Sequence, residues 1–178
     1  MPLKIVKLNL QDSQYGQEAA ARQARYDWFR SQMNSDDVLV TAHHMRDQVE
    51  TVLLRLFRGS GLLGLGAMHE IREFGLGWVA RPLLGVPKEV IISYARKNDL
   101  RYIEDPSNLH THIDRNFVRH EVLPLIRSRW PSIDGTIYRS SGHLKTTQSS
   151  LDKSAERDLK MCLSVSGSTL LGDYGCVR

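Results

Sequence analysis

Short apolar runs alternate with amphipathic segments in the first hundred residues, and this alternation most constrains what the chain can fold into. Residues 37–42, "DVLVTA", form an apolar run typical of a buried parallel strand. After it, apolar side chains from Val49 to Phe57 recur at the spacing of an amphipathic helix. Strands that alternate with helices predict an α/β fold with a parallel, doubly wound sheet.

Further elements extend the pattern on both sides. Strands are predicted over residues 2–10, over 77–84 and at the start of 100–108. Helices are predicted over residues 16–33 and 87–98, with Pro87 in a first-turn position. Gly59 is expected to end the helix that precedes it, and residues 59–68 are expected to form a glycine-rich loop.

From about residue 113 the pattern becomes helical and basic. Residues 113–130 are predicted to be helical, and Pro124 marks a kink or a break. One long helix is predicted over residues 132–161. We therefore expect two parts, an α/β domain over residues 1–112 and a helical domain over residues 113–178 with an incomplete C-terminus.

Composition places the chain among ordinary globular proteins. It has 178 residues, of which 41% are hydrophobic and 25% charged. A chain of this length can form a hydrophobic core without disulfides or structural metal ions. The net charge of +4 is typical of a protein with a polyanionic partner or with a solvated basic surface. Cys162 and Cys176 suggest no disulfide framework. With no signal peptide or apolar span in the sequence, we expect a cytoplasmic protein without a membrane partner.

The densest polar segment is "AHHMRDQVET", residues 42–51. It follows a predicted strand, and ligands in open parallel sheets bind at the carboxyl ends of strands. Three interpretations compete: a capped helix start, a metal site using His43 and Asp47, or a nucleotide or substrate site at a helix N-terminus.

Two other segments have both a structural and a functional interpretation. Residues 55–66, "RLFRGSGLLGLG", could present backbone N–H groups to a phosphate or simply end a helix, and they lack the GxxxxGK[ST] pattern. Arg115 and Arg119 share a helix face that is either solvated or bound to nucleic-acid phosphates.

The order of these motifs resembles the tRNA(Ile)-lysidine synthase family. The motifs are "ARQARYDWF", "AHHMRDQVET", "LLRLFRGSG", "GLGAM", "RPLL", "YIEDPSN" and "DRNFVRHEVLPLI". The resemblance runs from the start of the chain to about residue 160. It implies a partial PP-loop domain, adenine-nucleotide α-hydrolase-like and Rossmann-like, followed by an all-helical tRNA-binding segment.

The resemblance also implies an activity. These cytosolic ligases use ATP and Mg²⁺ to adenylate the C2 carbonyl oxygen of the wobble cytidine of tRNA(Ile). Free lysine then displaces AMP to give lysidine. The expected partners are therefore tRNA(Ile) and lysine. The alternatives are a non-catalytic remnant or tRNA-binding module, and another member of the superfamily with a different substrate.

The family's site residues carry over by motif. Catalytic roles fall to His43, His44 and Asp47. Substrate or nucleotide binding falls to Gln48, Glu50, Thr51, Arg58, Gly59, Ser60, Gly61, Arg81, Glu104, Asp105 and Asn108. Binding of tRNA falls to Arg115, Asn116, Arg119, Arg127 and Arg129. The acids are assigned only as a group to magnesium, lysine or base contacts, and no residue is assigned as a metal ligand.

Two departures from the family pattern stand out. The serine-glycine-glycine loop of the ATP site is absent, so we expect an N-terminally truncated chain that works with a missing N-terminal fragment or a second copy. Arg46 stands where the family commonly has an acid. A guanidinium there is expected to pair with Asp47 or Glu50 and to repel magnesium or a lysine ammonium.

Overall fold

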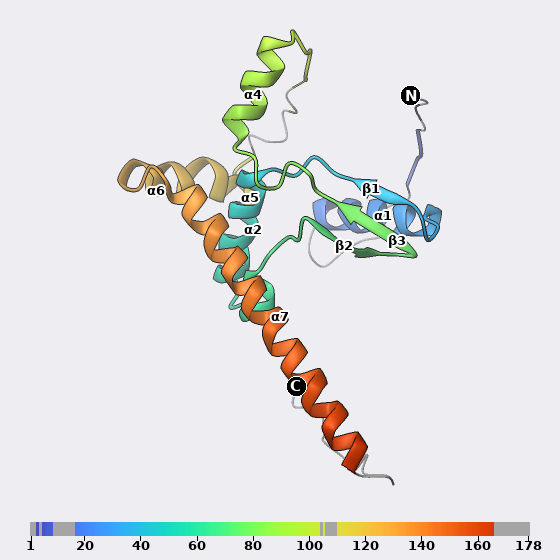
Figure 1. Ribbon diagram of the computed structural model, residues 1–178. Coiled ribbons are helices and arrows are strands. Elements are labelled where there is room, and N and C mark those ends of the chain that lie inside the picture. The colour runs from blue at the N-terminus through green and yellow to red at the C-terminus, as the bar shows by residue number, and fades with distance from the viewer. Residues whose placement is uncertain (1–2, 4, 9–16, 104, 106–109, 166–178) are drawn as a thin grey trace. The chain divides into compact units, whose positions relative to one another are not determined.

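The computed structural model describes residues 3, 5–8, 17–103, 105 and 110–165 (Figure 1). The chain divides into two compact units, each made of two stretches of sequence. Unit 1 contains residues 1–49 and 68–108, and unit 2 contains residues 50–67 and 109–178. Helix α2 (Met45–Phe57) begins in unit 1 and ends in unit 2. The assignment of domains to residues 1–112 and 113–178 stays a prediction.

Unit 1 contains a three-stranded sheet in the order β1-β3-β2. Strand β1 (Val38–Val40) pairs in parallel with β3 (Gly77–Ala80), and β2 (Ile71–Phe74) pairs antiparallel with β3. The α/β class is confirmed. The expectation of a wholly parallel sheet is wrong for the described strands, because β2 and β3 form a hairpin.

Glycines make this hairpin possible. Gly75, in the turn, has φ +63°, a conformation that costs little only for glycine. At Gly77 a Cβ would collide with the backbone carbonyls of Asn34 and Asp37. The hairpin can therefore lie against the segment that leads into β1.

Helix α1 (Gln17–Gln32), confirmed as predicted, covers one face of the sheet (Figure 1). Phe74 and Val79 are buried there together with Met33, and the Tyr26 ring meets the Phe74 ring edge-on with centroids 5.6 Å apart. The opposite face carries exposed apolar side chains at Val38, Val40, Ile71 and Trp78. Among the described residues, α1 covers one side of the sheet, and the other side carries these exposed apolar side chains.

Of the other elements predicted in unit 1, one helix is confirmed and two strands are not. Helix α4 (Lys88–Lys97) is confirmed, with Pro87 as its N-cap instead of in its first turn. The strands predicted over residues 2–10 and at the start of 100–108 are wrong for their described residues, none of which lies in a strand. Apolar residues form a strand only where a neighbouring strand pairs with their backbone, and these described segments pair with none.

Unit 2 is helical. Besides the end of α2 it contains α3 (Leu62–Leu65), α5 (Asp114–Phe117), η2 (Val118–Val122), α6 (Leu123–Arg129) and α7 (Ile133–Val165). The long helix predicted over residues 132–161 is confirmed. The glycine-rich stretch expected as a loop contains α3, which packs against α7. Leu53, Val118 and Leu123 form part of the buried interior.

Pro124 marks a change of helix type, as its sequence position suggests. It lies in the first turn of α6, directly after the π-helical segment η2. The N–H of Leu123 reaches back to the carbonyl of Val118, five residues earlier. Because proline has no N–H and its ring would clash with the carbonyl four residues before it, a widened turn lets the helix pass this point.

Across the described helices, none combines the length and the apolar character needed to cross a bilayer.

Candidate functional site

The junction between β1 and α2 holds the first polar cluster, in unit 1. The Thr41 N–H donates to the Ala80 carbonyl at 2.9 Å, which extends the parallel pairing beyond β1. The Thr41 hydroxyl lies 2.8 Å from Nδ1 of His43, and both side chains are half-buried. These two side chains are therefore held at the carboxyl end of the strand, where the sequence predicted a site.

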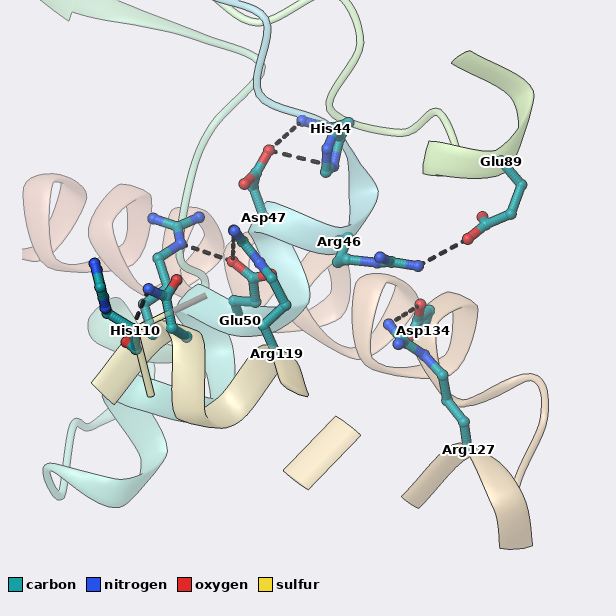
Figure 2. A network of polar contacts seen from close by, with 11 residues as sticks. His44, Arg46, Asp47, Glu50, Glu89, His110, Arg119, Arg127 and Asp134 are labelled. Atoms are coloured by element: carbon teal, nitrogen blue, oxygen red, sulfur yellow. Dashed lines mark hydrogen bonds and ion pairs between the residues drawn. The ribbon is translucent and has the colours of Figure 1, made fainter. Parts of the chain in front are cut away.

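Asp47 caps the start of α2. One of its carboxylate oxygens, Oδ2, accepts the His44 backbone N–H at 2.9 Å and lies 3.2 Å from Nδ1 of the same histidine (Figure 2). A carboxylate in this position satisfies a helix N–H and interacts favourably with the helix dipole. The structural interpretation of the polar segment thus accounts for these contacts, and the catalytic roles of His44 and Asp47 remain predictions.

Arg46 does not pair as expected. Its Nη2 lies 2.8 Å from Oε1 of Glu89, in the first turn of α4 (Figure 2). A pair with Asp47 is disfavoured because adjacent helix residues do not face each other. The carboxylate of Glu50 is already bound by two other arginines. The guanidinium therefore links α2 to α4.

Gln48 lies in the interior of unit 1, at 0% exposure. Its side-chain Nε2 donates to the Met68 carbonyl at 3.2 Å, and its Oε1 accepts the Met68 N–H at 2.9 Å. The amide thus satisfies both backbone groups of one residue in the 66–68 turn region. The role that the structure gives Gln48 is to hold this backbone, whereas the sequence predicted a ligand contact.

Glu50, in unit 2, is the centre of the second polar cluster. It is fully buried, and both carboxylate oxygens are bound by guanidinium groups. Arg119 donates from Nε to Oε1 at 2.7 Å and from Nη2 to Oε2 at 2.9 Å, while Arg115 donates from Nε to Oε2 at 2.7 Å. Figure 2 shows the carboxylate facing Arg119. Two-point pairing of this kind gives strong, directional hydrogen bonds.

The remaining predicted tRNA-binding residues also have contacts within unit 2. Asn116 is buried and donates to the His110 carbonyl at 3.0 Å. Arg127 binds Asp134 through two nitrogens, at 3.2 and 2.7 Å. The exposed Arg129 guanidinium lies 5.9 Å from the Trp130 ring centroid. Arg127 thus joins α6 to α7.

The loop after α2 ends the helix. Gly59 has φ +71°, and its N–H donates to the Leu56 carbonyl at 3.0 Å. The N–H groups of Arg58 and Ser60 donate to the Arg55 carbonyl. These three N–H groups are therefore used by the turn, which favours the structural interpretation over a phosphate cradle. The Arg58 side chain forms an exposed ion pair with Asp114, and Gly61 is the N-cap of α3.

Arg81, just after β3, is 3% exposed. Its Nη1 donates to the His69 carbonyl at 2.8 Å. Burial lowers the pKa of its guanidinium, the neighbouring guanidiniums of Arg72 and Arg22 lower this pKa further, and the Tyr26 side chain opposes the shift by a hydrogen bond. Sequence reasoning named Arg81 but not these three neighbours, although "ARQARYDWF" contains two of them.

Four predicted residues remain. Glu104 and Asn108 lie outside the described residues. Asp105 is exposed and Thr51 is half-buried.

A mixed α/β sheet with polar side chains after β1 and a helix beginning beside them is the arrangement of a nucleotide-binding-type domain. The PP-loop domain family matches residues 1–126, and the chain belongs to this family. The resemblance inferred from the motifs is thereby confirmed at the level of the domain.

Three similar proteins from different bacteria have the same name, tRNA(Ile)-lysidine synthase. The chain is 46% identical over 155 residues to the tRNA(Ile)-lysidine synthase of Pseudomonas syringae pv. tomato, covering 87% of the chain and 35% of that protein. It is 45% identical over 144 residues to that of Coxiella burnetii, covering 81% and 32%. It is 44% identical over 154 residues to that of Legionella pneumophila strain Lens, covering 86% and 36%. The chain thus spans about a third of the length of these relatives.

Proposed function

We propose that this chain is part of a tRNA(Ile)-lysidine synthase, an ATP-dependent carbon–nitrogen ligase that acts on tRNA(Ile) and lysine in the cytosol. One observation carries the proposal: 46% identity over 87% of the chain to a relative of that name. The PP-loop domain supports the use of ATP.

The proposed reaction has two steps. The C2 carbonyl oxygen of the wobble cytidine attacks the α-phosphorus of ATP, and pyrophosphate leaves. The amine of lysine then attacks C2, loses a proton, and displaces AMP together with the former carbonyl oxygen. The first step needs stabilisation of phosphate charge, and the second needs a group that accepts the proton.

The β1–α2 junction is the part of this chain that best fits the second need. His43 and His44 are the titratable bases there, and Asp47 holds the backbone of His44. We assign His43 to proton acceptance and Asp47 to positioning. The described residues nowhere bring three histidine, cysteine or acidic side chains together around a cation. Magnesium enters the proposal as a companion of ATP, and no step is assigned to it.

An exchange assay tests the proposal. The chain is incubated with ATP, labelled pyrophosphate and a tRNA(Ile) transcript, alone and together with the portion of the Pseudomonas syringae relative that precedes the matched region. We expect tRNA-dependent exchange in the complemented reaction. In His43→Ala we expect exchange to persist while lysidine formation is lost, because His43 is assigned to the second step. A complemented reaction that binds tRNA but shows no exchange would reject ligase activity.

A second candidate function is tRNA binding without catalysis. The observation that favours it is the Arg46–Glu89 ion pair, which places a cation where the family commonly has an acid. Restoring the acid with Arg46→Asp separates the two candidates. If the chain is a ligase part in which Arg46 hinders lysine, the complemented exchange stays similar and lysidine formation rises. If the chain only binds tRNA, neither quantity changes.

A further inference from the structure

Arg22 and Arg81 of unit 1 both interact with Tyr26, and Arg72 lies close enough to Arg81 to lower the pKa of its guanidinium. The Arg22 guanidinium lies over the Tyr26 ring, 4.8 Å from its centroid. Arg72 is paired with Val79 across the β2–β3 ladder, and Val79 is buried under α1. Side chains opposite each other share a face, as do those two residues apart in a strand. Arg72 and Arg81 therefore lie on the side of the sheet that α1 covers, together with Arg22.

This cluster lies at the carboxyl edge of the sheet. Helix α1 ends at Gln32, and the chain then enters β1 at Val38, so the helix runs antiparallel to β1 and β3. The first turns of α1 lie beside the carboxyl ends of β1 and β3 (Figure 1). Arg22 belongs to this part of the helix. Arg81 directly follows β3. Open α/β sheets bind ligands at this edge.

The charges in the cluster are not balanced by the described part of the chain. Among the ion pairs of the described residues, none involves Arg22, Arg72 or Arg81. Arg81 is almost fully buried, and its Nε has no hydrogen-bond partner among the described residues. Arg22 and Arg72 are exposed beside the buried Arg81. Like charges held close together repel one another, and an anion between them removes this repulsion.

We propose that Arg22, Arg72 and Arg81, on the side of the sheet that carries Tyr26, form a binding site for a phosphate group. Arginine suits phosphate because its planar fork donates two parallel hydrogen bonds. The phosphate belongs either to a nucleotide or to an RNA backbone. Only this choice of source rests on the proposed function, because the site itself follows from the geometry of unit 1.

Inorganic pyrophosphate is the probe for the test. It is titrated into the chain while calorimetry gives Kd and NMR follows the arginine Nε–H signals. We expect saturable binding with a shift of the Arg81 Nε–H. Arg22→Gln and Arg72→Gln should each weaken binding by about threefold or more. Arg96→Gln, an exposed arginine of α4, changes the net charge equally and should leave Kd unchanged.

Competition identifies the source of the phosphate. ATP or an anticodon stem-loop RNA is added to the pyrophosphate complex, and the one that displaces pyrophosphate and moves the same Arg81 signal is the source. Equal weakening by all three variants, or binding without any change at Arg81, would overturn the site. Thermal unfolding of each variant verifies its fold. Pyrophosphate binding that persists without tRNA-dependent exchange rejects the ligase and keeps the site.

Discussion

Gln48 and Glu50 are two residues apart on α2, and both are fully buried although both are polar. Each is stable in the interior only because the fold supplies its partners. Gln48 binds the backbone N–H and carbonyl of Met68, whereas the Glu50 carboxylate binds two guanidinium groups. The two side chains therefore respond differently to substitution.

Glu50→Gln removes the charge that Arg115 and Arg119 share. We expect the free energy of unfolding to fall by about 2 kcal/mol, less than for a fully buried pair because both guanidiniums keep some contact with water. Urea unfolding followed by circular dichroism measures the change. Glu121→Gln, at an exposed position of η2, is the matched control and should stay within about 0.5 kcal/mol of the parent chain.

Gln48→Leu keeps the side-chain volume but leaves the Met68 N–H and carbonyl without the amide. Since each lost hydrogen bond costs about 0.5–1.5 kcal/mol, we expect a loss of about 2 kcal/mol in the free energy of unfolding. The exposed Gln23→Leu on α1 serves as control. An equal loss in both variants, measured by the same unfolding curves, would contradict the role given to Gln48.

At the scale of elements, α2 ends because Gly59 adopts a left-handed conformation. A Cβ at Gly59 or at Gly142 would meet nothing within 4 Å, so neither substitution is limited by space. Gly59→Ala should lower the free energy of unfolding by about 1 kcal/mol through backbone strain. Gly142→Ala, within α7, should raise it by roughly 0.5–1 kcal/mol. Changes of the same sign in thermal unfolding would contradict this account.

Elements with a strong local pattern were predictable. The spacing of apolar residues from Val49 to Phe57 fixed α2, and the turn at Gly59 followed from its glycine. The strand β2 was missed because "IREF" has two charged residues in four and pairs only through its hairpin with β3. The strand expected over residues 2–10 shows the opposite case, a strand-like composition whose described residues lie in no sheet.

The candidate site was predictable as a set of residues but not as a set of contacts. The segment after β1 was identified because it is polar and follows an apolar run. Its pairings were not, because Glu50 meets Arg115 and Arg119 at separations of 65 and 69 residues. No local spacing encodes such a contact. Arg72 was overlooked for the same reason, since only the β2–β3 register brings it to the side of α1.

In the described part of unit 1, the face of the sheet opposite α1 is apolar and exposed, and this concerns the molecule's behaviour in solution. Val40 and Ile71 are each 64% exposed there, beside Val38 and Trp78. Sheets with parallel strands usually bury both faces. An exposed apolar patch of this kind favours association with other surfaces.

Replacing Val40 and Ile71 by threonine tests this. We expect weaker binding of the dye ANS and less light scattering at high concentration, with the free energy of unfolding changed by less than about 0.5 kcal/mol. Val79→Thr, on the covered face at 0% exposure, should do the reverse. It should lower the free energy of unfolding by about 1–2 kcal/mol without reducing dye binding.

The shared carboxylate of Glu50 also has a genetic consequence. Two guanidiniums from one stretch of the chain depend on a single side chain from another. Loss of Glu50 removes a contact from two cations at once, whereas loss of one arginine leaves the carboxylate bound to the other. We therefore expect substitution at position 50 to be tolerated less than substitution at position 115 or 119.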